Sequence, residues 1–177
     1  MAYNVVASGT GGFTSRLGLI CLAIVVLSAA ALGGALAIEH IGGIAPCPLC
    51  LDQRIAYYAA VPLALLAFML LPGNLRFCRV ILALLAVGFL VNAGLGIYHS
   101  GIEWGWWPGP DTCSGVGTIA TTPGALLESL KNPRVVRCDD AALRILGLSL
   151  AGYSALVSAL LAALAGLSAA AGRSLTR

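Results

Sequence analysis

The stretch VILALLAVGFLVNAGLGIY, residues 80–98, contains no charged side chain. A helix needs about 20 predominantly apolar residues to cross the hydrocarbon core of a membrane. Three further apolar runs of similar length lie at about residues 17–38, 55–71 and 145–167. Because the bilayer core offers no water, each run has to pair its backbone polar groups internally, as a helix does. The sequence therefore predicts an all-α membrane protein, a bundle of four transmembrane helices.

The composition supports this class. Hydrophobic residues make up 59% of the chain and charged residues only 10%, and the mean hydropathy is +0.95. Soluble domains carry about 25% charged residues, so a soluble fold is excluded. We expect 177 residues to form a single membrane domain, 1–177, with outer loops at about 39–54 and 99–144 and no separate soluble catalytic domain.

The basic residues predict how the bundle is oriented. Arg16 precedes the first span, Arg76 and Arg79 lie between the second and third, and Arg173 and Arg177 follow the fourth. These three segments contain no Asp or Glu. Since Lys and Arg collect on the cytoplasmic side of short loops, we expect both termini to be cytoplasmic.

The first apolar run has an alternative interpretation. Ala35-Leu36-Ala37 resembles the small-residue site at which a secretory signal is cleaved. The apolar region of such a signal is about 7–15 residues long, whereas this run continues over about 20. We therefore favour a span, and cleavage would leave the sidedness of the rest unchanged.

This topology divides the six cysteines between two compartments. Cys21 lies inside the first span, where it is most simply a small apolar filler, and Cys78 lies in the inner loop. The other four lie in outer loops, in an oxidising compartment where disulfides persist. By segment they fall into two pairs: Cys47 with Cys50, and Cys113 with Cys138.

The first pair stands in the motif Pro46-Cys47-Pro48-Leu49-Cys50. A bond across two intervening residues closes too short a loop to add much stability, so the spacing favours redox chemistry. The two prolines leave Cys50 near the first turn of the second helix. The partial positive charge at a helix N-terminus stabilises a thiolate, so we expect Cys50 to be the more acidic thiol.

Arg54 follows Cys50 by four residues, on the same face of the helix. Its guanidinium can there reach a thiolate or an oxygen of a reduced ring compound. An arginine at this depth needs a partner, and pairing with Asp52 or Glu39 is the alternative role.

The second outer loop has the features of a segment that lies on the membrane. Trp104, Trp106 and Trp107 lie together in it, and tryptophan prefers the membrane–water boundary. Further on, Thr122-Pro123 is typical of a helix start. We expect a short interfacial helix there.

Cys113 and Cys138 bracket this expected helix. A bond between them would close a loop of about 25 residues and stabilise the fold by roughly 3 kcal/mol in the chain-entropy model. The sequence is compatible with two roles for this pair. It can be a structural disulfide, or it can be a second redox pair within reach of the first. The presence of two outer pairs on one small membrane protein favours the second role, in which electrons pass from one cysteine pair to the other.

Together these motifs resemble the DsbB family, disulfide bond formation proteins of bacterial inner membranes. The resemblance runs from Arg16 to the end of the fourth span and rests on three features. These are Pro46-Cys47-x-Leu49-Cys50-x-x-x-Arg54, a histidine after the third span followed by a Pro-containing stretch and Cys113, and Cys138 eight residues before Leu146-Gly147-Leu148.

The resemblance implies a sequence of thiol–disulfide exchanges. The Cys113–Cys138 disulfide would reoxidise a periplasmic thioredoxin-fold protein similar to DsbA, with Cys113 forming the mixed disulfide. Cys138 would then attack Cys47 and release Cys50 as a thiolate.

The same resemblance implies that Cys50 passes the electrons to a quinone, ubiquinone or menaquinone, from the membrane pool. Arg54 and His99 are similar to the family's quinone-contacting residues, although a histidine at a span end is also a common interfacial residue. Tyr57 and Tyr58 could line the pocket, but with Asn92 they are expected mainly to tie helices together. No metal and no nucleic acid partner are expected.

Two other classes of function fit parts of the sequence. A heavy-metal binding or transport protein would also use a membrane Cys-x-x-Cys, because soft metals prefer thiolates. Arg54 offers a metal no ligand, however, and Cys113 and Cys138 lack metal-ligand spacing. A noncatalytic scaffold with two structural disulfides is the third class.

Overall fold

Four long helices make up the structure. The computed structural model describes residues 3–110, 113 and 137–171, with side chains from residue 14 onward. The helices are α1 (Tyr3–His40), α2 (Pro48–Leu70), α3 (Leu75–Glu103) and α5 (Leu150–Ala171). Each is long and apolar enough to cross a membrane. The predicted four-helix membrane architecture is confirmed.

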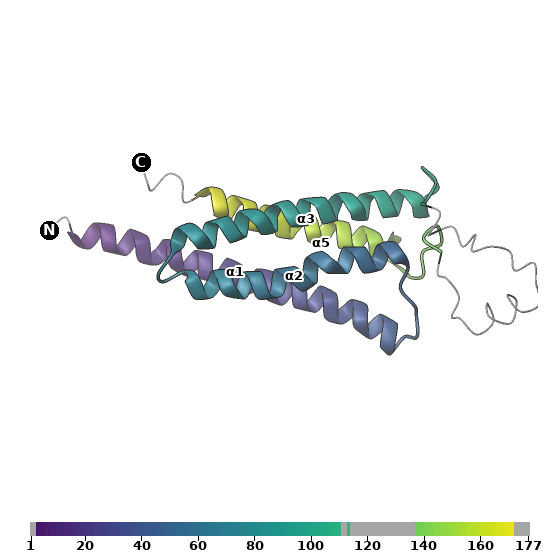
Figure 1. Cartoon of the computed structure of the whole chain (residues 1–177), viewed down its shortest axis with the longest axis horizontal. Helices are drawn as coiled ribbons and strands as arrows, with labels where there is room; N and C mark the ends of the chain where they lie inside the picture. Colours follow the sequence, from purple (N-terminus) through teal and green to yellow (C-terminus); the bar gives the residue numbers. More distant parts are fainter. Residues whose placement is uncertain (1–2, 111–112, 114–136, 172–177) are drawn as a thin grey trace, which may run out of the picture.

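The helices alternate in direction (Figure 1). The α2–α3 connection lies at the same end as the start of α1 and the end of α5, and the opposite end holds the start of α2 and the end of α3. The most extensive packing is between α3 and α5. Phe89, Leu82 and Leu161 are buried between the helices, whereas large apolar side chains such as Leu19 and Val91 face outward, as expected of a surface in lipid.

A polar junction joins three helices in the middle of the bundle. The Ser158 hydroxyl of α5 lies 2.9 Å from the Tyr57 hydroxyl of α2 and accepts a hydrogen bond of 2.9 Å from the Asn92 amide of α3. All three side chains are buried. Tyr57 and Asn92 thus tie helices together as expected, while Tyr58 is 51% exposed on the outer surface.

The fourth span begins at Leu150, whereas the apolar run predicted a start near residue 145. Residues 144–149 instead form a tight hairpin of β1 (Arg144–Ile145) and β2 (Leu148–Ser149). Its two turn residues, Leu146 and Gly147, have positive φ angles of 52° and 83°, which suits a two-residue hairpin. The Ser149 hydroxyl then accepts a hydrogen bond from the Gly152 amide and so caps α5.

The basic end of the bundle is closed by a cap between helices. The Arg79 guanidinium donates two hydrogen bonds, of 3.1 and 3.0 Å, to the Ala169 carbonyl in the last turn of α5. This satisfies a carbonyl that the helix itself leaves unpaired. Nearby, the buried thiols of Cys21 and Cys78 contact each other, and Cys78 lies within α3 and not in the loop before it.

The three tryptophans gather where α3 ends. Trp107 donates a hydrogen bond of 2.9 Å to the Tyr98 carbonyl, and its ring stacks on the Tyr98 ring. Trp104 and Trp106 pack edge to face beside it and stay more than half exposed. Such half-buried indoles fit a membrane–water boundary. The expected interfacial helix near Thr122 lies outside the described residues.

Close packing of α3 on α5 depends on Gly96. A Cβ at this position would lie 2.9 Å from the Cβ and backbone nitrogen of Ala155, whereas a Cβ at Gly88 or Gly94 would meet no atom within 4 Å. Of the three glycines that the sequence offers near Asn92, Gly96 is therefore the one that permits the approach.

We predict that Gly96→Val destabilises the folded protein by about 1–3 kcal/mol, because the added methyl groups force α3 away from α5. Thermal unfolding in detergent, followed by circular dichroism, measures the effect. Gly94→Val is the matched control, since position 94 faces outward. Equal losses in both variants would contradict the prediction.

Candidate functional site

The N-terminus of α2 holds the first cysteine pair. Cys47 is the N-cap, with an extended backbone (φ −75°, ψ 163°), and its sulfur accepts a hydrogen bond of 3.2 Å from the Cys50 backbone amide. Pro48 occupies the first helical position, where a missing N–H costs nothing. Cys50 therefore lies in the first turn of α2, as the motif predicts. Both residues are free thiols in this structure.

The second pair is joined as the Cys113–Cys138 disulfide. The Cys138 backbone amide also donates a hydrogen bond of 3.2 Å to the Cys113 carbonyl. Both cysteines are only 1% exposed and pack with Cys47, Leu49 and Ile102 in a small apolar cluster at this end of the bundle. The disulfide is thus held against α2 and the last turn of α3.

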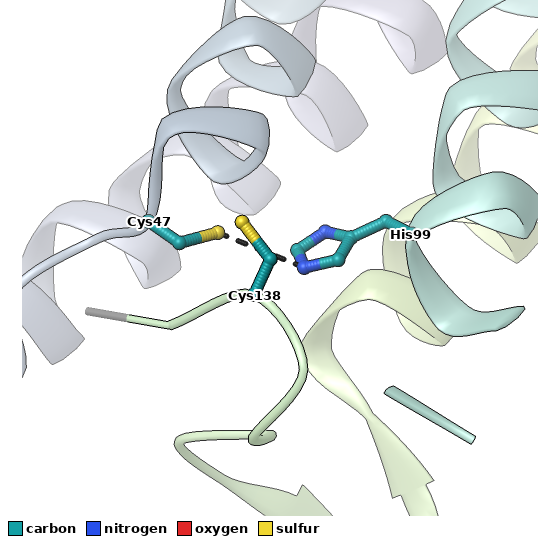
Figure 2. A group of neighbouring side chains, drawn as sticks. All are labelled: Cys47, His99 and Cys138. Carbon is teal, nitrogen blue, oxygen red and sulfur yellow. Dashed lines mark hydrogen bonds between the residues drawn. The ribbon is translucent and has the colours of Figure 1, made fainter. Parts of the chain in front are cut away.

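Sulfur atoms from both pairs meet at a single histidine (Figure 2). The ligand atoms of Cys47, Cys138 and His99 all lie within 4.8 Å of one another, and all three residues are buried. Residues from the start of α2, the end of α3 and the loop before β1 are brought together here. The arrangement gives the sulfur of Cys138 a short path to that of Cys47.

The imidazole of His99 is surrounded by polar side chains, although it is only 2% exposed. Its Nδ1 lies 3.0 Å from the Gln53 amide nitrogen, and its Nε2 lies 3.6 Å from the Cys47 sulfur and 3.9 Å from Glu103 Oε1. Sequence reasoning missed Gln53 and Glu103. Their spacing was the available signal, since Gln53 precedes Tyr57 by one helical turn and Glu103 follows His99 by one turn.

Arg54 forms an ion pair with Glu39 near the end of α1. It also donates a hydrogen bond of 3.4 Å to the Ala35 carbonyl. Pairing with Glu39 is the alternative that the sequence left open. It joins α1 to α2 and balances a guanidinium whose side chain is only 12% exposed.

A partly open cavity of about 300 Å³ adjoins these groups. Its walls include many apolar side chains of α1 and α5, together with polar groups of α2, α3, α5 and the loop before β1. Cys50, Arg54, Tyr57 and His99 all contribute to its lining. Such a cavity suits a flat, largely apolar molecule with a few polar atoms. The cavity therefore joins the first cysteine pair to space within the membrane bundle.

Residues 16–168 match the family described as "Disulfide bond formation protein DsbB". The chain belongs to the DsbB family. A protein named Disulfide bond formation protein B 1, from Pseudomonas entomophila, is 41% identical over 90 residues, which cover 49% of this chain and 48% of that protein. Disulfide bond formation protein B of Acinetobacter baylyi is 42% identical over 65 residues, or 37% of this chain and 38% of that protein.

The likeness to individual DsbB proteins is partial in length. This chain spans about half the length of the curated Pseudomonas relatives that it matches. An uncharacterized protein of Rickettsia prowazekii matches over a longer stretch, with 28% identity over 147 residues, 81% of this chain and 82% of that protein. No solved structure matches this chain.

The two thiols of the first DsbB pair differ in environment. A hydrogen bond with Cys50, together with burial, raises the pKa of the Cys47 thiol. Cys47 is also only 3% exposed, whereas Cys50 is half-buried, although both line the cavity. Because the thiolate is the reactive form, Cys47 should be the slower nucleophile near neutral pH.

We predict that limiting iodoacetamide at neutral pH alkylates Cys50 at least about tenfold faster than Cys47, since each unit of raised pKa lowers the thiolate fraction about tenfold. The protein is first treated so that Cys113–Cys138 stays oxidised, and peptide mass mapping measures the labelling. Cys50→Ala is the comparison: it removes the hydrogen bond to Cys50 and leaves burial as the main cause of the raised pKa, so Cys47 should be labelled faster there than in wild type. In wild type, faster labelling at Cys47 than at Cys50 would contradict the prediction.

Proposed function

We propose that this DsbB-family protein is a thiol:quinone oxidoreductase that reoxidises a periplasmic DsbA-like dithiol protein and so sustains disulfide bond formation. The observation that carries the proposal is the meeting of Cys47 and Cys138 within 4.8 Å beside an apolar cavity. Two cysteine pairs in contact can exchange a disulfide, and the cavity provides room for a lipid-soluble acceptor.

The proposed reaction transfers two electrons and two protons from a dithiol to a quinone. A thiolate of the partner protein attacks Cys113, and the Cys113–Cys138 bond breaks with release of the Cys138 thiolate. The second partner thiol then resolves the mixed disulfide. Cys138 attacks Cys47 and releases Cys50 as a thiolate next to the cavity. The partner leaves as a disulfide. Cys113, freed in that step, then attacks Cys138, which restores the Cys113–Cys138 bond and releases Cys47. Two electrons and two protons would pass from Cys47 and Cys50 to the quinone as their bond re-forms, so both cysteine pairs end oxidised.

The residues around the cavity fit a quinone as the electron acceptor. When bound, a quinone accepts two electrons and two protons and leaves as a quinol. The apolar walls from α1 and α5 would suit its ring and tail, Arg54 would donate an N–H to a ring oxygen, and the imidazole of His99 lines the same cavity. Glu39 would share the Arg54 guanidinium with such an oxygen.

We place the protein in a bacterial inner membrane with both termini in the cytoplasm. Arg16, Arg76 and Arg79 lie at the end of the bundle opposite to the cysteine pairs, which agrees with the positive-inside rule. The cysteine pairs would then face the periplasm, where disulfides persist.

Quinone reduction tests the proposal directly. Purified protein in detergent is mixed with a reduced DsbA-like protein and ubiquinone-1, and quinone absorbance is followed. Wild type should consume one quinone per partner dithiol, whereas Cys50→Ala should lose at least about 10³-fold in rate, because no thiolate faces the cavity. No consumption by wild type, or undiminished consumption by Cys50→Ala, would refute the proposal.

A heavy-metal site is the second candidate, because Cys47, His99 and Cys138 group as three possible ligands. This grouping differs from the sequence expectation that Cys138 lacks metal-ligand spacing. The Cys138 sulfur, however, is bonded to Cys113, and a disulfide sulfur is not a thiolate ligand. A transport function would require stoichiometric binding of Cd²⁺ by protein whose disulfide is intact, and we expect equilibrium dialysis to find less than about 0.1 ion per chain.

A further inference from the structure

We propose that His99, oriented by Gln53, donates a hydrogen bond to the sulfur of Cys47 during exchange between the two cysteine pairs. Gln53 is then a positioning residue for that exchange. The inference rests on the proposed function and deepens it, because it assigns the imidazole to the sulfur relay and not only to the quinone.

The imidazole of His99 lies close to the sulfur of Cys47. His99 Nε2 lies 3.6 Å from the Cys47 sulfur, within the range of an N–H···S hydrogen bond. The Cys138 sulfur lies within 4.8 Å of both atoms. In Figure 2 the ring edge points toward the two sulfurs. An N–H donor at this position lies at the sulfur atom through which the two cysteine pairs exchange a disulfide.

Gln53 decides which ring nitrogen carries the proton. Its side-chain amide nitrogen lies 3.0 Å from His99 Nδ1, and an amide nitrogen can only donate. With the Gln53 amide oriented in this way, Nδ1 accepts, and the proton of the neutral ring lies on Nε2, which faces Cys47. Gln53 is 4% exposed and His99 2% exposed, so little water competes for these bonds.

A second N–H donor converges on the same sulfur. The Cys50 backbone amide lies 3.2 Å from the Cys47 sulfur, because Cys47 caps α2. The backbone donor and the imidazole come from α2 and α3, and together they form a small anion-stabilising site around one sulfur atom. Donors fixed in advance at the position where charge develops lower a reaction barrier.

Cys47 is the sulfur at which the exchange step takes place. The Cys138 thiolate attacks the Cys47 sulfur, the Cys47–Cys138 bond forms, and the Cys47–Cys50 bond breaks with its electron pair leaving on Cys50. No proton is transferred. In the transition state the charge is carried mainly by the attacking and leaving sulfurs, Cys138 and Cys50, and in smaller part by Cys47, the central sulfur, so a donor at Cys47 stabilises only that part of the charge. The described state, with Cys113–Cys138 oxidised and Cys47 reduced, already holds close together the two sulfurs that this step joins, those of Cys47 and Cys138.

A Cys113→Ser background isolates this step from both the partner and the quinone. Cys138 is then a free thiol beside an oxidised Cys47–Cys50 pair. A jump from acidic to neutral pH starts the exchange, acid quenching stops it, and mass mapping of the Cys47–Cys138 linkage gives the rate. Gln53→Met should slow this rate about tenfold, because the imidazole loses the contact that keeps its proton on Nε2.

Asp52→Asn is the matched control. Asp52 precedes Gln53 on the same turn of α2 but is exposed and does not line the cavity, so the exchange rate should stay unchanged. If Gln53→Met unfolds, His99→Gln and His99→Leu give an equivalent comparison. The glutamine retains an N–H donor and should exchange faster than the leucine.

The outcomes separate this inference from the proposed function. In the wild-type background, Gln53→Met should lower kcat for ubiquinone-1 reduction and leave KM for ubiquinone-1 within about twofold. An unchanged exchange rate with a raised KM would overturn the inference and assign His99 to the quinone alone. Failure of wild type to reduce ubiquinone-1 would refute the proposed function, while a slowed exchange in Gln53→Met would still support the role of Gln53.

Discussion

The site depends on a hydrogen-bonded junction two helical turns away from it. Ser158 binds Tyr57 of α2 and Asn92 of α3 in the apolar interior, where an unpaired polar group would be costly. The junction therefore fixes the rotation and the axial register of these antiparallel helices. Gln53 lies one turn from Tyr57, and His99 lies two turns from Asn92. The helix faces that meet at Ser158 thus meet again at the contact between Gln53 and His99.

The same geometry explains how sulfur chemistry and a membrane cavity share one end of the bundle. The cap of α2 places Cys47 inside the buried cluster with Cys138, and Cys50, three residues later, packs against that cluster; both cysteines also line the cavity. Arg54 lies one further turn along the helix, where Glu39 balances its charge. An uncompensated guanidinium at this depth would be expensive, so the ion pair lets a strong N–H donor remain beside an apolar space.

Sequence reasoning recovered the features that depend on composition and on local spacing. Membrane spans follow from apolar length, and the position of Cys50 in the first turn of α2 follows from Pro48. The start of α5 was misplaced because Ile145, Leu146 and Leu148 continue the apolar run, although their backbone forms a hairpin. Contacts between distant segments, such as Gln53 with His99, depend on helix register, which no local pattern specifies. The partner of Arg54 remained open for the same reason, since Asp52 and Glu39 were equally available.

His99 lies beside both the cysteine cluster and the cavity because of where α3 ends. The helix continues to Glu103, so His99 lies inside its last turns, is covered by the cysteine cluster and is held on both sides by polar groups. A histidine at a frayed helix end would be free to follow a ligand, whereas this imidazole has one orientation fixed before any ligand binds. Fixed orientation suits a group that acts on a sulfur atom of the same protein, because donor and acceptor are then both placed by the fold. The buried histidine is therefore better explained by the sulfur that it touches than by the membrane surface near it.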